Sequence, residues 1–249
     1  MVAELPARMG AAGNRPAAVA LSPLLRQARR VRKRFPSLPE ALGEHSGLER
    51  AADGTGLLRL LVIGDSTAAG VGVTYMRDAL PPQLAAILAA RRGCAVGWTV
   101  SARTGATASV TAEELAPAAP VEQDIAVVLV GVNDALKMTP RQTWRASMDR
   151  LVDVLQRHVR PGGQIVLAGL PNLWKFRAFP QPLRAVLGWH GRALDQELRQ
   201  IGRRRLAVMH VAMPPVSWPE MFAEDRFHPN AAAYRRLAAH FGAALITHG

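Results

Sequence analysis

The chain has 249 residues, of which 49% are hydrophobic, and its 31 Lys plus Arg against 19 Asp plus Glu leave a formal net charge of +12. This apolar content suffices for a packed core and excludes a chain that is disordered throughout. The single cysteine, Cys94, excludes an internal disulfide and a zinc cluster built on cysteines. The positive charge favours anionic partners such as nucleic acid, lipid headgroups or acidic substrates.

The location of the protein is predicted from its hydrophobic segments. No window approaches about 18 consecutive apolar residues, the length that a transmembrane helix needs. The N-terminus lacks the pattern of a signal peptide, because its apolar patch at residues 17–21 is short and precedes the basic cluster. We therefore expect a cytoplasmic protein that is able to rest on a membrane surface.

Residues 1–55 differ from the rest, being rich in Ala, Arg, Pro and Gly, and we expect them to form a basic N-terminal extension. Ser22 can cap a helix, Pro23 suits its first turn and Pro36 ends it. Arginines cover one face of this segment, residues 22–35, and the other face is apolar: Leu24, Ala28, Val31 and Phe35. It can bind an anionic membrane or a partner, or its apolar face can pack on the rest of the chain. No aromatic residues alternate with the basic run, so nucleic acid is not expected as a partner.

Strands and helices alternate from residue 57 to the end of the chain. In chain order we expect a strand at 57–63, a helix at 76–92 that bends near Pro81, strands at 96–102 and 124–130, a helix at 140–159 stopped by residues 161–163, a strand at 164–170, a helix at 185–204, a strand at 206–212 and a helix at 230–246. Five buried strands separated by helices predict an α/β fold with three α/β/α layers around a five-stranded parallel sheet. This domain is expected to cover residues 56–249.

The residues that can carry chemistry lie just past the strand ends and in the last loop. Ser66 follows the first strand, Gly105 the second and Asn133 the third, while Asp225 and His228 come from the loop before the last helix. The carboxyl ends of parallel strands open on one edge of a sheet, so these residues can meet although they are distant in the sequence.

Their side chains suit nucleophilic catalysis. An alcohol is a poor nucleophile at neutral pH and needs a base, a role that suits His228. Asp225 lies three residues earlier and can orient the imidazole and stabilise its charged form. A tetrahedral intermediate also needs hydrogen-bond donors, and the N–H groups of Ser66 and Gly105 with the amide of Asn133 can supply them.

The pattern resembles the SGNH (GDSL-type) hydrolase family. The resemblance rests on Gly64-Asp65-Ser66 with Gly70 and Gly72, on Gly105, on Gly131-x-Asn133-Asp134 and on Asp225-x-x-His228-Pro229, in this order over residues 57–247. It implies a bacterial-type serine esterase that cleaves carboxylic esters or thioesters through an acyl-enzyme on Ser66, with His228 as base and acid, Asp225 as its partner, and no metal or cofactor. It also implies that Asp65 is a structural neighbour of the serine. Asp134 is expected to shape its loop.

The substrate pocket is predicted from an apolar stretch that follows the fourth strand. Trp174 and Phe176, with Met221 and Phe222 from the last loop, are expected to line a pocket for small acyl, aryl or lipid-like groups, or else to pack on the core. An alternative interpretation of the whole chain is a protein without catalysis that binds phosphate, a nucleotide or an anionic membrane, because a glycine-rich turn can hold phosphate. The oligomeric state is left open.

Overall fold

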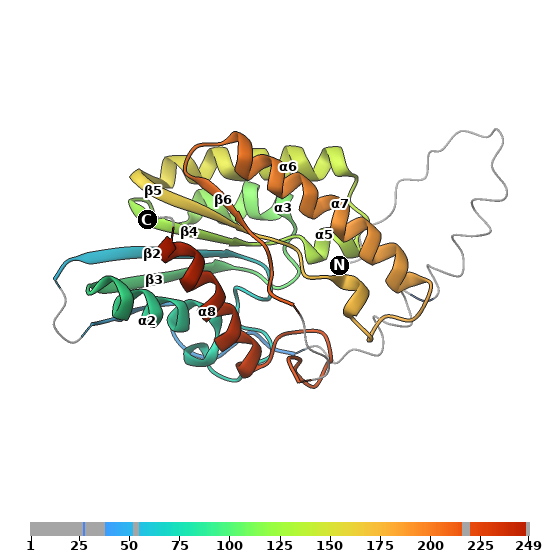
Figure 1. Cartoon of the computed structure of the whole chain (residues 1–249), viewed down its shortest axis with the longest axis horizontal. Coiled ribbons are helices and arrows are strands. Elements are labelled where there is room, and N and C mark those ends of the chain that lie inside the picture. Colours follow the sequence, from blue (N-terminus) through green and yellow to red (C-terminus); the bar gives the residue numbers. More distant parts are fainter. Residues whose placement is uncertain (1–26, 28–37, 52–54, 216–219, 248–249) are drawn as a thin grey trace.

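The computed structural model describes residues 27, 38–51, 55–215 and 220–247 (Figure 1). The predicted amphipathic segment 22–35 lies outside the described residues apart from Gln27. The side-chain amide of Gln27 donates to the carbonyl oxygen of Gln181 at 3.0 Å and accepts from the N–H of Leu183 at 3.4 Å. This residue of the extension therefore lies beside the chain at residues 181–183.

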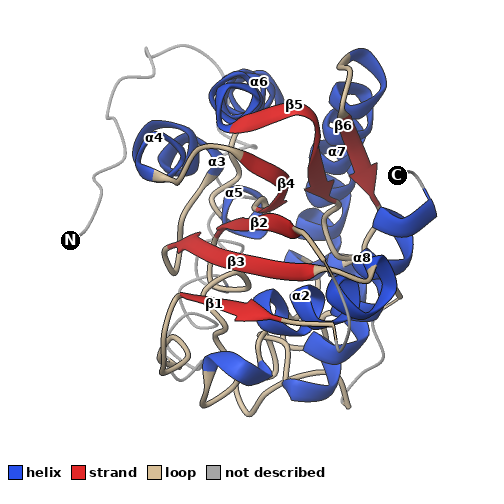
Figure 2. Cartoon of the chain, turned by 90° about the vertical axis from the view of Figure 1, so that its left-hand side faces the viewer, coloured by secondary structure: helices blue, strands red, loops and turns tan. Residues whose placement is uncertain are grey.

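The described residues form one six-stranded sheet with the order β1-β3-β2-β4-β5-β6 (Figure 2). Its strands are β1 (Ser46–Glu49), β2 (Leu57–Gly64), β3 (Ala95–Ala102), β4 (Gln123–Leu129), β5 (Val159–Ala168) and β6 (Val208–Val211). The five strands from β2 to β6 are parallel, as predicted, and β1 pairs antiparallel with β3. The expectation of five strands is thus corrected to six. The sixth strand comes from residues assigned to the N-terminal extension, where four residues without an apolar run carry no strand signal.

Helices cover both faces of the sheet. They are η1 (Met76–Asp78), α2 (Leu80–Arg92), α3 (Ala108–Val110), η2 (Thr111–Leu115), α4 (Ala116–Ala118), α5 (Val132–Leu136), α6 (Arg141–His158), η3 (Leu173–Lys175), α7 (Leu183–Arg204) and α8 (Ala231–Thr247). Helices α6 and α7 lie on one side of the sheet, and α2 and α8 lie on the other (Figure 1). The predicted three-layer α/β/α architecture is confirmed.

The alternation of side chains along β2 shows why this strand is apolar throughout. Leu61 and Ile63 belong to the core under α6 and α7, whereas Leu60 and Val62 belong to the core under α2 and α8. All four are fully buried. Because successive side chains of a strand point to opposite faces, a strand covered on both faces must be apolar at every position.

Several element bounds differ from the prediction for local reasons. The helix expected at 76–92 is broken at Ala79, whose extended backbone separates η1 from α2, and Pro81 and Pro82 occupy the first turn of α2, where a missing N–H costs least. Helix α6 ends at His158, and β5 starts at once, so residues 161–163 lie in the strand. The short helical run from α3 to α4 was not predicted.

None of the helices among the described residues combines the length and the apolar character that are needed to cross a bilayer.

Candidate active site

The site lies where the order of the parallel strands reverses. Strand β2 is followed in the chain by β3 on one side and later by β4 on the other side. In an open α/β sheet the crevice between two such strands, at their carboxyl ends, is the usual place for a ligand. Ser66 follows β2 and Asn133 follows β4, so both candidate residues lie at this crevice.

The turn that carries Ser66 depends on a close approach of β2 to β4. Gly64 has a φ of +151°, and a Cβ at this position would lie 2.0 Å from the carbonyl oxygen of Leu129. The N–H of Asp65 donates to that same oxygen at 2.9 Å. The carbonyl of Ser66 then accepts from the N–H of Val71 at 3.0 Å, which closes the turn. Glycine at position 64 therefore allows β2 to deliver Ser66 to the crevice.

Ser66, His228 and Asp225 form a chain of hydrogen bonds. The Nε2 atom of His228 lies 3.0 Å from Oγ of Ser66, and its Nδ1 atom lies 2.5 Å from Oδ2 of Asp225. The second carboxylate oxygen of Asp225 accepts from the N–H groups of Phe227 and His228 at 2.9 and 3.0 Å. An ionised carboxylate only accepts, so Nδ1 carries the proton and Nε2 is left to accept from the serine hydroxyl.

The charge of Asp225 follows from its surroundings. Burial of this carboxyl raises its pKa, but the hydrogen bonds from the ring of His228 and from the N–H groups of His228 and Phe227 outweigh burial. The pKa of Asp225 therefore lies below its usual range, and the group is ionised at neutral pH.

The loop that carries His228 is held from two sides. A Cβ at Gly72, whose φ is +104°, would lie 2.2 Å from the carbonyl oxygen of Pro229, so the loop rests directly on the serine turn. The ring of Phe227 packs edge-on against the imidazole of His228, with centroids 4.9 Å apart. Phe227 in turn contacts Phe176, at 5.8 Å between centroids. These contacts limit the positions open to the histidine ring.

The candidate oxyanion donors differ in their surroundings. The amide nitrogen of Asn133 donates to the carbonyl oxygen of Ala106 at 3.1 Å and faces Oδ2 of Asp65 at 3.4 Å. Gly105 is exposed, has a φ of +81° and lies on the turn closed by the hydrogen bond from the N–H of Ala106 to the carbonyl of Arg103. Among the described residues, the N–H groups of Ser66 and Gly105 donate to no protein acceptor, which leaves them available to a ligand.

Two buried carboxyl groups, those of Asp65 and Asp134, lie next to the candidate site residues in the chain. Burial, opposed mainly by the hydrogen bond from the N–H of Thr67, raises the pKa of Asp65 to about 6. Burial likewise raises the pKa of Asp134 to about 6, against a hydrogen bond from the N–H of Ala108. Asp134 thereby joins the loop after β4 to the start of α3, in line with its expected part in shaping a loop.

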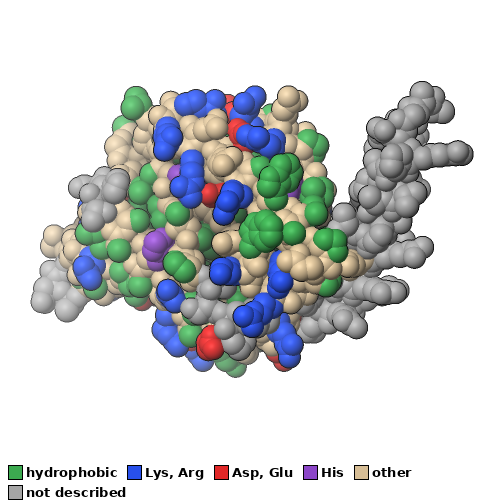
Figure 3. Space-filling model, turned by 45° about the vertical axis from the view of Figure 1, so that its right-hand side comes forward, with side chains coloured by type: hydrophobic (Ala, Val, Ile, Leu, Met, Phe, Trp, Pro, Cys, Tyr) green, Lys and Arg blue, Asp and Glu red, His purple; other side chains and the backbone are tan. Residues whose placement is uncertain are grey.

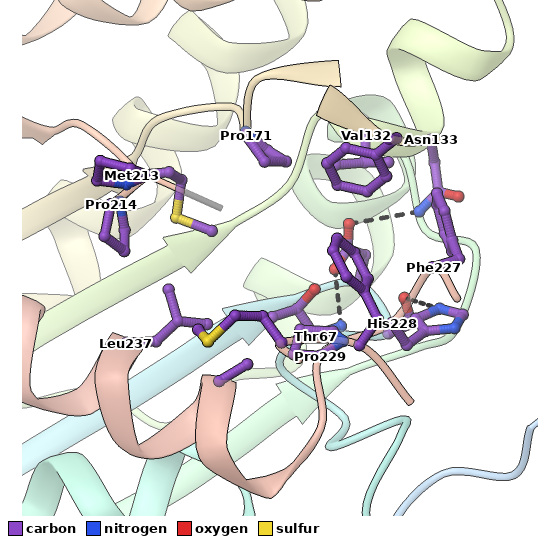
Figure 4. A pocket seen from close by; sticks show the side chains of 17 residues that line it. Thr67, Val132, Asn133, Pro171, Met213, Pro214, Phe227, His228, Pro229 and Leu237 are labelled. Carbon is purple, nitrogen blue, oxygen red and sulfur yellow. Dashed lines mark hydrogen bonds between the residues drawn. The ribbon is translucent and has the colours of Figure 1, made fainter. Parts of the chain in front are cut away.

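An apolar cavity opens beside Ser66 and His228 (Figure 4). Of the side chains predicted to line a pocket, Phe176, Met221 and Phe222 line it. Trp174 does not. Its indole lies against Gly188 of α7, where a Cβ would come within 2.4 Å of the ring, and 42% of its surface is exposed. Gly105 is also absent from the lining.

Other lining residues were not predicted from the sequence. In Figure 4 the cavity extends from the end with His228 and Asn133 to the end with Met213, Pro214 and Leu237. Met213 follows β6 by two residues, so the rule that placed Ser66 after its strand could have found it. Leu237 lies inside α8 and carries no local signal, because only the packing of this helix turns it towards the cavity.

No group of three or more His, Cys, Asp or Glu side chains is placed to hold a metal ion in the part of the chain that the structure describes.

Comparison with known proteins identifies the family. The model of the GDSL-like Lipase/Acylhydrolase family matches residues 62–236. The GDSL-like esterase Rv1075c of Mycobacterium tuberculosis is 31% identical over 189 residues, which are 73% of this chain. The chain spans 59% of the length of that relative.

Solved structures share the fold at low identity. The lipase Lip_vut3 from a goat rumen metagenome superposes with a TM-score of 0.59 at 14% identity, covering 75% of this chain and 97% of that one. The esterase EstA from Pseudoalteromonas sp. gives a TM-score of 0.58 at 14% identity, covering 76% and 97%. Because the family match spans the serine turn, the asparagine after β4 and the histidine loop, the chain belongs to the GDSL-like lipase/acylhydrolase family.

Proposed function

We propose that the protein hydrolyses carboxylic esters through an acyl-enzyme on Ser66. The observation that carries this proposal is the hydrogen-bonded chain from Ser66 through His228 to Asp225 at the edge of an apolar cavity. A nucleophile, a base within hydrogen-bond reach of it and a carboxylate that orients the base are the parts that acyl transfer to a serine requires.

Acylation begins at the hydroxyl of Ser66. Its Oγ attacks the carbonyl carbon of the ester while Nε2 of His228, 3.0 Å away, accepts the proton. The imidazolium that forms is stabilised by the ionised carboxylate of Asp225 on its other side. His228 then gives this proton to the oxygen of the leaving alcohol, and the acyl group remains on Ser66.

The negative charge of the tetrahedral intermediate needs donors. We assign this role to the N–H groups of Ser66 and Gly105 and to the side-chain amide of Asn133. The Asn133 amide has two hydrogens; one serves the carbonyl of Ala106, and the long 3.4 Å contact to Asp65 leaves the second able to turn to an oxyanion.

Deacylation repeats the same steps with water. His228 accepts a proton from a water molecule, whose oxygen attacks the acyl carbon, and the proton returns to Oγ of Ser66 as the acid is released. Each proton moves between Ser66, His228, the leaving alcohol and water, so Ser66 and His228 return to their starting states at the end of the cycle.

The lining of the cavity supports an apolar acyl or aryl group as substrate. The rings of Phe176 and Phe222 meet edge-on with centroids 5.1 Å apart, and Met213 and Leu237 extend the apolar surface. Such a surface provides few hydrogen-bonding groups for the hydroxyls of a sugar. Esters or thioesters with small acyl, aryl or lipid-like groups are therefore the proposed substrates.

The observations favour hydrolysis over phosphate binding by the glycine-rich turn. The turn carries the buried carboxyl of Asp65, whose pKa of about 6 leaves it mostly ionised at neutral pH and repulsive to phosphate. Phosphate binding by this turn would also give no role to the hydrogen bond between His228 and Asp225.

The test compares the wild type with Ser66→Ala on p-nitrophenyl acetate, butyrate and octanoate. Ser109→Ala, a serine on α3 outside the cavity, is the matched control. We expect hydrolysis by the wild type and the control, and a loss of at least about 10³-fold in kcat/KM for Ser66→Ala. A folded Ser66→Ala variant with the wild-type rate would contradict the proposal, as would a wild type that hydrolyses none of the three esters.

A further inference from the structure

The chain from residue 171 to residue 194 contributes Pro171 and Phe176 to the lining of the cavity and contains no Asp or Glu. It carries two exposed tryptophans: 69% of the surface of Trp189 and 42% of that of Trp174 is accessible. An exposed tryptophan leaves a large apolar surface in contact with water, and two of them in one short segment call for an explanation.

The two tryptophans are held in place by the fold. The side-chain oxygen of Asn172 accepts from the N–H of Trp174 at 3.2 Å and orders η3. The indole of Trp174 covers Gly188, the residue before Trp189, so η3 packs against the part of α7 that carries the second tryptophan. Arg192 follows Trp189 by three residues and lies on the same side of the helix.

Exposed cations lie close to these tryptophans in the chain. Lys175, Arg177 and Arg192 are exposed, and within the described residues none of them has a carboxylate within 4.0 Å. Arg199, two turns after Arg192 on α7, differs because it is paired with Asp195 at 3.0 Å. We define the Trp patch as the five exposed residues Trp174, Lys175, Arg177, Trp189 and Arg192.

The Trp patch adjoins the cavity wall at Lys175 and Arg177. Phe176 stands between Lys175 and Arg177, is 4% exposed and lines the cavity, so the chain turns its cations outward and its aromatic ring inward. Figure 3, which brings the side with α7 forward, shows hydrophobic side chains with Lys and Arg beside them. A surface that touches Lys175 and Arg177 would therefore lie next to a wall of the cavity.

We infer that the Trp patch binds the surface of an anionic lipid membrane, so that esters pass from the lipid directly into the cavity. Tryptophan prefers the interface between water and acyl chains, where its ring is apolar and its N–H stays wet. Unpaired Lys and Arg attract anionic headgroups. The inference that the bound enzyme takes its substrate from the lipid rests on the proposed function, whereas membrane binding itself does not.

The binding test uses the full chain with Ser66→Ala, so that catalysis cannot alter the lipid. Sedimentation with vesicles of phosphatidylcholine alone is compared with vesicles that also contain phosphatidylglycerol. We expect binding to the anionic vesicles only. Each cation contributes about a fivefold factor near such a surface, so Arg177→Glu with Arg192→Glu lowers the partition coefficient by at least about 25-fold. Trp189→Ala lowers it as well.

Leu206→Ala is the matched control, because Leu206 is 91% exposed just past the far end of α7, where Arg205 is paired with Asp149 and Asp153. It is expected to bind like the parent. Failure of the parent to bind anionic vesicles would overturn the inference. The inference would also be overturned if Trp189→Ala and the double charge variant both bound as strongly as the parent. The membrane contact would then lie elsewhere, for example in residues 22–35.

A second measurement separates this inference from the proposed function. With Ser66 intact, Trp189→Ala is expected to keep the wild-type rate on soluble p-nitrophenyl acetate and to lose rate on a p-nitrophenyl ester embedded in anionic vesicles. Equal losses on both substrates would contradict a role in membrane binding. Vesicle binding without any hydrolysis would instead refute the proposed function and leave the membrane contact standing.

Discussion

The turn that presents Gly105 is tied to the N-terminal part of the chain through one carboxylate, and removing it should slow catalysis. Oε1 of Glu40 accepts from the N–H of Thr104 at 2.8 Å and from its hydroxyl at 2.7 Å. The next residue, Ala41, donates its N–H to the carbonyl of Ala69 at 3.1 Å. Residues 40–41 therefore connect the turn with Gly105 to the turn that carries Ser66.

The magnitude follows from these two hydrogen bonds. A hydrogen bond to a charged group contributes about 1.5–3 kcal/mol when it is buried, and solvent at the half-exposed Glu40 reduces this to about 1–2 kcal/mol for the pair. If that free energy holds the N–H of Gly105 towards the oxyanion, Glu40→Ala lowers kcat by about 5- to 30-fold. The upper limit is the loss of one oxyanion donor, about 10²- to 10³-fold.

The assay is steady-state hydrolysis of p-nitrophenyl butyrate, with thermal unfolding followed in parallel. Glu40→Ala is expected to lower kcat and to change KM by less than about twofold, because a transition-state contact is lost. Glu40→Gln keeps an acceptor in place and should retain most of the rate. Glu44→Ala, an exposed carboxylate on the same segment, is the control. A folded Glu40→Ala variant with the wild-type kcat would refute the reasoning.

Three further predictions concern the charges and glycines of the site. Asp225→Asn should lower kcat by about 10⁴-fold in the same assay, because an amide can donate to Nδ1 of His228 and favours the wrong tautomer; a loss below tenfold would contradict this. Because the pKa of Asp65 is raised to about 6, the free energy of unfolding has its full value below pH 4 and falls by about 3 kcal/mol as the pH rises through 6. Asp65→Asn should flatten this slope in urea titrations at several pH values, and an unchanged slope would argue against the shift. Gly64→Ala should destabilise the protein by about 2–6 kcal/mol, since its Cβ would meet a strand carbonyl at 2.0 Å. Gly93→Ala, which also has a positive φ but nothing within 4 Å, should cost about 1 kcal/mol.

Local patterns in the sequence were sufficient for the main sheet and for the residues around Ser66. Continuous apolar runs identify parallel strands because both faces of such a strand are buried, and each strand end places the next few residues at one edge of the sheet. This rule alone predicts that Ser66 and Asn133 lie close together. The short spacing from Asp225 to His228 needs only one loop, so its geometry is also local.

Other features depend on contacts between residues far apart in the chain, which no local pattern records. Strand β1 is four residues long, and only its pairing with β3 makes it a strand. Glu40 meets Thr104 across 64 residues, and Leu237 turns to the cavity because α8 packs in one orientation.

Trp174 shows the same limit most clearly. Its apolar character suggested a pocket residue, yet the space over Gly188 accepts its indole and leaves it facing solvent. The sequence by itself thus determined the five parallel strands, the places of Ser66 and Asn133 at the sheet edge and the pairing of Asp225 with His228 in one loop, because periodicity, strand ends and short spacings are local properties. The tertiary structure alone decided which side chains line the cavity, which face solvent and how the N-terminal residues support the site, because these depend on packing between distant segments.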